Sequence, residues 1–211
     1  MRDSVGGFSD GWGSAGVFVE RDASLSLSRV VCLRNETFGV AATLGGAIVL
    51  SDVAVWDTLP SACAFATCAD QPAGIGAAGY RGGRLGFSRF SIARAHLCGV
   101  QVAREGELDL ADGEVAESAI GVCLQVEGYD VGRLTDAVRY RDNGATIEAT
   151  TFPVPDADRS NRAIEGAQRA RLGERGEVHA NDGRRLLDGC MPGGPWAGSP
   201  DSRRRGRAGS R

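Results

Sequence analysis

The stretch GVFVERDASLSLSRVVCLRN occupies residues 16–35, and GVAATLGGAIVLSDVAVWDT occupies residues 39–58. The second stretch begins 23 residues after the first and repeats its spacing of apolar positions, while nearly every polar residue differs. Within one copy the apolar positions come in pairs two residues apart, which is the period of a β-strand and not of a helix. The repeat therefore predicts three short strands per copy, with bends at ERDA and at SR.

The same offsets recur along the chain. Two more copies follow after steps of 37 and 23 residues, so the middle step contains one repeat and a 14-residue insertion, and a looser fifth copy includes Val138 and Tyr140. The equivalent apolar positions are Leu25, Ile48, Leu85 and Leu108; Leu27, Leu50, Phe87 and Leu110; Cys32, Val55, Ile92 and Val115; and Val30, Val53 and Phe90, with Gly113 as the exception. Stacking such copies buries one continuous apolar column and pairs every strand with the strands above and below it.

Two outward positions of the repeat alternate in charge from copy to copy. One column reads Arg29, Asp52, Arg89 and Asp112, and the other reads Arg34, Asp57, Arg94 and Glu117. In an in-register stack these side chains are nearest neighbours, where opposite charges attract by roughly a few tenths of a kcal/mol. The alternation supports the parallel stack independently of the apolar pattern.

The region from about residue 6 to residue 155 resembles the bacterial right-handed parallel β-helix repeat proteins of the pectin-lyase-like superfamily. The stretches that carry the resemblance are GVFVERDASLSLSRVVC, GAIVLSDVAVWDT, GRLGFSRFSIARA and GELDLADGEVAES. We therefore predict an all-β fold, a single-stranded right-handed parallel β-helix (solenoid) of about five coils. The handedness is what the resemblance implies, because the repeat itself does not define it.

Charge divides the chain into two parts. Residues 1–155 hold 12 Arg and 19 Asp or Glu, a net charge of −7, whereas residues 156–211 hold 12 Arg and 8 acids, a net charge of +4. We predict a β-helix repeat domain over 1–155, with an inserted loop at 58–74, and a low-complexity, mostly disordered Arg-rich tail over 156–211. We interpret the Arg-rich end as solvated and expect no nucleic-acid partner.

The inserted loop contains the closest pair of cysteines. Cys63 and Cys68 are separated by four residues, which suits a local disulfide better than a zinc site, because no second close pair or nearby histidine completes four ligands. Long loops on repeat scaffolds often carry binding, so Cys63, Cys68 and Asp70 are the candidate binding residues. A tolerated surface excursion is the alternative interpretation of the loop.

Two other cysteines lie about one coil apart. The sequence leaves open whether Cys98 and Cys123 form a disulfide or remain buried free thiols. Cys32 falls in an apolar column, and we expect it to act only as a core residue. A bridged loop pair would indicate an oxidising compartment, in agreement with the export that the resemblance implies, although no secretory signal is visible.

The acidic residues of the fourth copy are the candidate catalytic groups. Carbohydrate-cleaving members of the resembled superfamily gather carboxylates on one outer sheet, and the densest acidic cluster here is Asp109, Asp112 and Glu114, with Arg89 one copy away. Yet Asp112 and Arg89 also belong to a column of alternating charge, which is typical of a neutralised structural ladder. We prefer the ladder, and we predict neither a metal nor another cofactor.

The resemblance implies a non-catalytic extracellular or cell-surface repeat protein, which we expect to bind polysaccharide or another surface molecule. The alternative is a polysaccharide lyase or glycoside hydrolase acting on acidic polysaccharide. An enzyme should show unpaired carboxylates at one level of the stack, whereas a scaffold should match each carboxylate to an arginine. No stretch approaches the roughly 20 apolar residues of a membrane-spanning helix. A missing N-terminal segment of a longer protein is a further alternative, because no cap is evident before the first copy.

Overall fold

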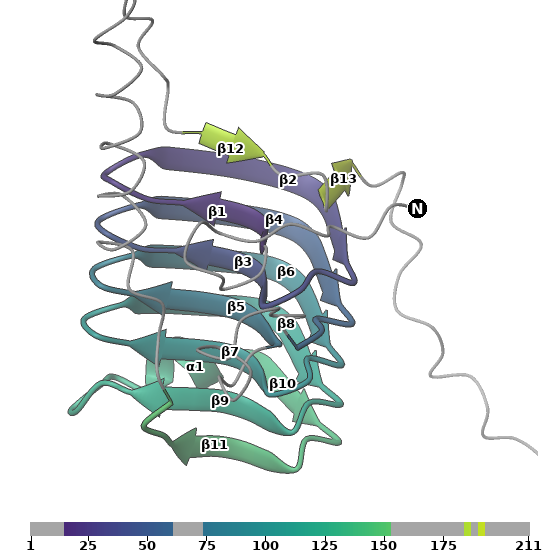
Figure 1. The fold of residues 1–211 in the computed structure, drawn as a ribbon. Helices are drawn as coiled ribbons and strands as arrows, with labels where there is room; N and C mark the ends of the chain where they lie inside the picture. Colours follow the sequence, from purple (N-terminus) through teal and green to yellow (C-terminus); the bar gives the residue numbers. More distant parts are fainter. Residues whose placement is uncertain (1–14, 61–73, 153–183, 187–189, 193–211) are drawn as a thin grey trace, which may run out of the picture.

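The computed structural model describes residues 15–60, 74–152, 184–186 and 190–192, and its strands form a parallel β-solenoid of about five turns (Figure 1). The fold class predicted from the repeat is confirmed. The strands are β1 (Ala15–Val19), β2 (Ser24–Leu33), β3 (Phe38–Ala42), β4 (Ala47–Trp56), β5 (Ile75–Tyr80), β6 (Arg84–Ala93), β7 (Cys98–Ala103), β8 (Glu107–Ala116), β9 (Ile120–Gln125), β10 (Val138–Arg141), β11 (Ala145–Ala149), β12 (Arg184–Leu186) and β13 (Cys190–Pro192), with one short helix, α1 (Gly132–Thr135).

The strands form two sheets, which we call sheet A and sheet B. Sheet A has the order β11-β9-β7-β5-β3-β1-β12, and sheet B has the order β10-β8-β6-β4-β2-β13. The turns of the solenoid pair in parallel, whereas β12 and β13 pair antiparallel with β1 and β2 at the first turn. These two short strands are the described residues of the predicted tail. The rest of the tail, and residues 61–73 of the predicted loop, lie outside the described residues.

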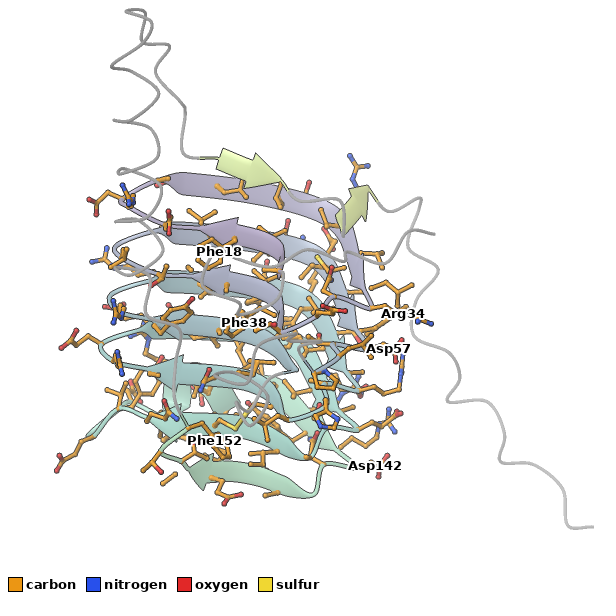
Figure 2. The ribbon with its side chains drawn as sticks, in the orientation of Figure 1. Phe18, Arg34, Phe38, Asp57, Asp142 and Phe152 are labelled. Atoms are coloured by element: carbon orange, nitrogen blue, oxygen red, sulfur yellow. A yellow bond between two sulfur atoms is a disulfide. The ribbon has the colours of Figure 1, made fainter. Side chains whose placement is uncertain are left out.

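The apolar files predicted from the repeat are confirmed by the strand register. Leu25 pairs with Ile48, Ile48 with Leu85, and Leu85 with Leu108. Leu25 is half-buried in the first turn, and the other three are at most 2 % exposed. Each such leucine or isoleucine stabilises the stack by about 1.5–3 kcal/mol through burial. Figure 2 shows the side chains along the stacked turns.

Each long strand of sheet B is bent at its sixth residue, so the sheet has two facets. The bend residues Arg29, Asp52, Arg89 and Asp112 all have a left-handed backbone, with φ between 49° and 54°. The predicted bend at SR therefore exists, but the prediction of separate strands on either side of it is wrong. Both facets belong to one continuous strand of ten residues, because pairing with the neighbouring turns resumes immediately after the bend.

The last turn departs from the repeat in the first facet of sheet B. Val138 and Tyr140 pair with Gly113 and Val115, so the second facet continues into β10 as predicted. Helix α1 takes the place of the first facet, and its Leu134 is fully buried in the core. The Tyr140 hydroxyl donates a hydrogen bond of 2.7 Å to the Leu134 carbonyl oxygen, which fastens the helix to the strand.

Sheet A has apolar side chains on both of its faces. Its inward residues, such as Val40 and Val100, join the solenoid core, whereas Phe38, Ala41 and Ala78 belong to a second buried cluster. Phe152, which follows β11, packs against that second cluster. The outer face of sheet A is therefore covered, whereas the outward positions of sheet B include exposed side chains.

Candidate functional site

A groove of about 790 Å³ crosses the second facet of sheet B, from β4 to β10. We call it the Trp56 groove. The strands position its side chains because positions 56, 91, 93, 114, 139 and 141 alternate with the core residues and point away from the core. The residues that define its chemistry are Trp56, Ser91, Arg94, Glu114, Arg139 and Arg141.

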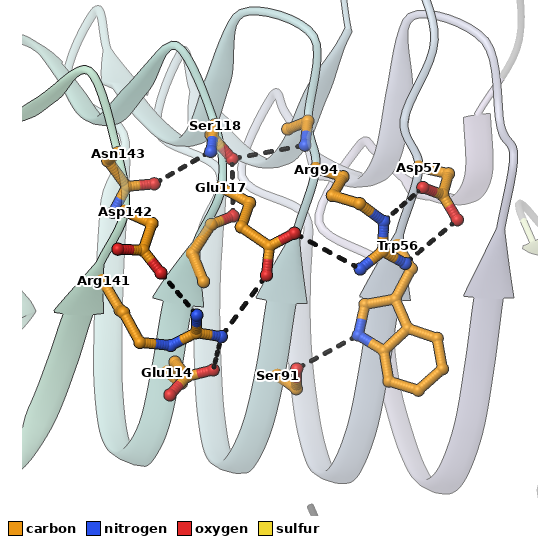
Figure 3. A network of polar contacts seen from close by, with 12 residues as sticks. Trp56, Asp57, Ser91, Arg94, Glu114, Glu117, Ser118, Arg141, Asp142 and Asn143 are labelled. Carbon is orange, nitrogen blue, oxygen red and sulfur yellow. Dashed lines mark hydrogen bonds and ion pairs between the residues drawn. The ribbon is translucent and has the colours of Figure 1, made fainter. Parts of the chain in front are cut away.

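Trp56 is held in place from two sides. Its indole Nε1 donates a hydrogen bond of 3.1 Å to the Ser91 hydroxyl on the next turn. The guanidinium carbon of Arg94 lies 5.9 Å from the ring centroid, within the range of a cation–π interaction. Figure 3 shows the hydrogen bond from the indole to Ser91 and the Arg94 side chain next to the ring. The structure thus fixes the orientation of an aromatic side chain that lines the groove.

One rim of the groove is a ladder of alternating charges (Figure 3). Arg94 donates two hydrogen bonds to the Asp57 carboxylate, at 2.6 and 3.1 Å. The Glu117 carboxylate lies 4.0 Å from Arg94 and 3.3 Å from Arg141 on the following turn. The hydrogen bonds with Asp57 raise the pKa of Arg94. The sign alternation seen in this sequence column is therefore a physical ladder of ion pairs.

Glu114 is one of three carboxylates that line the groove, and its side chain is 20 % exposed. Two arginines of the next turn contact it, Arg141 at 3.3 Å and Arg139 at 3.6 Å. The hydrogen bond to Glu114, and then the one to Asp142, raise the pKa of Arg141. Glu114 is consequently an ion-paired group and not a free acid or base.

The acidic cluster that the sequence singled out does not converge in space. Asp112 is itself a bend residue, with φ of 53°, so Asp109 lies on the first facet of sheet B and Glu114 on the second. Asp109 accepts two hydrogen bonds from Arg133, at 2.7 and 2.8 Å. Arg89 is bound to Asp52 by hydrogen bonds of 2.6 and 2.8 Å. The structure therefore distributes the four candidate catalytic residues over two facets and a corner.

A smaller concavity of about 460 Å³ lies on the first facet, beside α1. Val49, Gly86, Asp109 and Arg133 line it, and the Val49 side chain is 60 % exposed. Phe87 is the aromatic residue among those that line this concavity, which has no tryptophan comparable to Trp56.

The structure joins Cys98 and Cys123 in a disulfide with a Cα–Cα distance of 5.9 Å. Of the two alternatives that the spacing left open, the bridged pair is the one observed. Cys32 is fully buried in its predicted column, but it is also disulfide-bonded, so the expectation that it acts only as a core residue was wrong. Its apolar surroundings carry no sign of that bond, since a half-cystine packs like any small apolar residue.

The predicted binding residues Cys63, Cys68 and Asp70 lie outside the described residues. Trp56, Arg139 and Arg141 were not singled out from the sequence. Trp56 had a detectable signal, because it occupies an outward position of the repeat, level with Leu33 and two alanines, where a large aromatic side chain has no core to fill.

Comparison with known proteins assigns neither a family nor a function to this chain. No protein-family model, curated protein or solved structure matches this chain. Among the helices of the described residues, none is long and apolar enough to cross a membrane. Within the same described ranges, no three His, Cys, Asp or Glu side chains gather as a group that could hold a metal ion.

The Asp109–Arg133 pair predicts a small, pH-dependent contribution to stability. Its hydrogen bonds lower the pKa of Asp109, so the contribution is present above the unfolded-state pKa of about 3.9 and is lost as the pH falls through the lower folded-state value. Because the Asp109 side chain is 61 % exposed, we expect Asp109→Asn to lower the free energy of unfolding by at most about 1 kcal/mol at neutral pH. Urea titrations at several pH values measure this effect.

The difference between wild type and Asp109→Asn should shrink as the pH falls below about 4, because the unfolded chain then binds a proton at Asp109 that the folded protein binds only at lower pH. Glu148→Gln is the matched control, since Glu148 is exposed on β11 and has no ion pair within the described part of the chain. A loss that grows as the pH falls would show that the Asp109 carboxylate is not stabilised by Arg133.

Proposed function

We propose that this protein is a non-catalytic extracellular or cell-surface β-solenoid that binds polysaccharide in the Trp56 groove. The observation that carries the proposal is an oriented tryptophan, Trp56, in a groove where Glu114, Glu117 and the three lining arginines already form ion pairs within the protein. Small-molecule sites combine an apolar or aromatic surface with a few placed polar groups, and this groove has both. We also propose that the protein is related to the pectin-lyase-like superfamily, which its repeat resembles.

The expected mode of binding follows from the chemistry of the two partners. The C–H face of a sugar ring packs against the indole of Trp56, which keeps its orientation through the hydrogen bond to Ser91. Sugar hydroxyls both donate and accept hydrogen bonds, so they can bond to a carboxylate and a guanidinium of the same ion pair. The turns repeat every ~4.8 Å, so successive sugar units along the groove can meet successive turns, which present Ser91, Glu114 and Arg139 at one equivalent position.

The pairing of the carboxylates favours binding over the lyase or hydrolase alternative. Glycoside hydrolysis requires two carboxyl groups that flank one bond, one as acid and one as base or nucleophile. Glu114 is held by Arg139 and Arg141, and Asp109 is held by Arg133 on the other facet. Among the three carboxylates that line the groove, Glu114 and Glu117 are ion-paired and Asp112 has no ion pair to a described residue, so the groove does not offer two unengaged carboxylates.

The proposed location outside the cytosol is supported by the disulfides. The Cys98–Cys123 bridge and the bonded Cys32 are both fully buried. Disulfides of this structural kind form and persist in oxidising compartments and are rare in reducing ones.

The experiment is a polysaccharide array probed with the full chain, with release of reducing ends and of unsaturated uronates measured in parallel. We expect binding without product, and we expect Trp56→Ala to weaken binding by about tenfold or more through the loss of ring stacking. Val49→Ala, on the first facet, is the matched control and should bind like wild type. Product formation that disappears in Glu114→Gln would overturn the proposal in favour of the enzyme.

A further inference from the structure

We propose that the polysaccharide bound in the Trp56 groove is uncharged. This inference rests on the proposed function and names its ligand class. It starts from the charges that line the groove, which balance. The lining includes three arginines and three acids, namely Arg94, Arg139 and Arg141 against Asp112, Glu114 and Glu117. A groove built for a polyanion would instead expose an excess of arginine, because guanidinium groups bind carboxylates and sulfates bidentately.

The arginines of the groove are also occupied. Arg94 is bonded to Asp57 through two hydrogen bonds, and Arg141 contacts both Glu114 and Glu117 at 3.3 Å. Arg139, the most exposed of the three at 77 %, lies 3.6 Å from Glu114. An anionic sugar therefore meets guanidinium groups that a protein carboxylate already neutralises. It would have to compete with Glu114 for both of its partners and would approach that carboxylate itself.

The net charge of the whole solenoid also disfavours a polyanionic ligand. Residues 1–155, which include every turn, carry 12 Arg and 19 acids, a net charge of −7. A surface of that sign slows the approach of a polyanion and favours an uncharged chain or a cation. The Trp56 ring does not select for a cation, because Arg94 already lies over it at 5.9 Å. An uncharged glycan is the ligand that meets none of these penalties.

Neutral hydroxyls suit an ion-paired surface. A carboxylate in a pair, such as that of Glu114, keeps free lone pairs that accept hydrogen bonds, and a guanidinium has five N–H donors, of which a pair uses only some. A hydroxyl placed between them bonds to both without adding a charge. Specificity of this kind depends on geometry and hardly on ionic strength, since no net charge is brought together.

The test compares uncharged polysaccharides (a glucan, a mannan and a xylan) with polygalacturonate and alginate, using the full chain at low and high salt. We expect an uncharged glycan to bind best, with a dissociation constant that changes less than about twofold between about 0.05 and 0.5 M NaCl. Tighter binding of an acidic glycan that weakens steeply with salt would overturn the inference and leave the proposed function standing. Binding to none of the five would overturn the proposed function and the inference with it.

A charge-changing variant provides the second arm. Glu114→Gln removes the carboxylate that Arg139 and Arg141 share, so the groove gains one net positive charge while the side chain keeps its size. We expect this variant to acquire salt-sensitive binding to polygalacturonate. Asp109→Asn makes the same change of charge on the first facet, away from the groove, and should not acquire it. Equal gains in the two variants would show that overall charge, and not the groove, selects the ligand.

Discussion

Cys98→Ala is expected to lower the free energy of unfolding by about 3.5 kcal/mol at room temperature, because the broken disulfide links positions 25 residues apart. Opening that loop lets the unfolded chain regain conformational entropy. The bridge also joins Cys98 in β7 to Cys123 in β9 on the neighbouring turn, so it ties the fourth and fifth turns of the stack together. Urea-induced unfolding under oxidising conditions measures the loss.

The matching variants distinguish loss of the bridge from loss of packing. Cys123→Ala should cost about as much as Cys98→Ala, and the double variant should cost little more than either, because each change breaks the same bond. Fully additive losses would mean that the two positions contribute through packing alone. Since the stability of a domain is commonly about 5–15 kcal/mol, a loss of the expected size is readily measured.

Gly113→Ala is expected to lower the free energy of unfolding by about 3 kcal/mol, because the added methyl group overpacks the core. Gly113 interrupts the file of Val30, Val53 and Phe90, and a Cβ at this position would overlap carbons of the Phe90 ring. The Phe90 ring is only 3 % exposed and stands edge-on to Phe87 at 5.7 Å between centroids, so it has little room to move. Thermal and urea unfolding measure the effect.

Gly86→Ala is the matched control in the same sheet. A Cβ at Gly86 meets no atom within 4 Å, so this variant should stay within about 0.5 kcal/mol of wild type. Combining Gly113→Ala with Phe90→Leu should recover part of the loss, because the smaller side chain vacates the overlapping volume. If Gly113→Ala were as stable as Gly86→Ala, the ring of Phe90 would not occupy the space above Gly113.

The glycine at position 113 illustrates what the repeat revealed and what it did not. The alignment marked Gly113 as the exception in an otherwise apolar column, which is a property of the sequence. The reason for the exception is that Phe90, one turn away, fills the volume of two side chains. Compensation between turns of this kind depends on the size and rotamer of a neighbour that is 23 residues distant, and a periodicity argument has no access to either.

The acidic cluster illustrates the opposite case. In the sequence, Asp109, Asp112 and Glu114 lie within six residues, and their closeness made them the candidate catalytic groups, although we preferred a structural ladder of charges. The left-handed backbone of Asp112 turns the strand between the other two and places them on different facets. Left-handed φ is uncommon for residues with a side chain, and neither Asp112 nor Arg89 differs in type from an ordinary surface residue. The sequence indicated a bend at Asp112, but it did not indicate that this bend separates Asp109 from Glu114.

The sequence by itself determined that this chain is a stack of parallel turns, because a period of two within a copy and a constant offset between copies leave one way to bury the apolar positions. It also determined the ladder of alternating charges, since residues with the same offset become neighbours in any in-register stack. Only the tertiary structure decided which outward residues share a surface. Trp56, Glu114 and Arg141 come from three different turns. They line one groove because all three follow the bend in their strands or turns and the register stacks these second facets side by side.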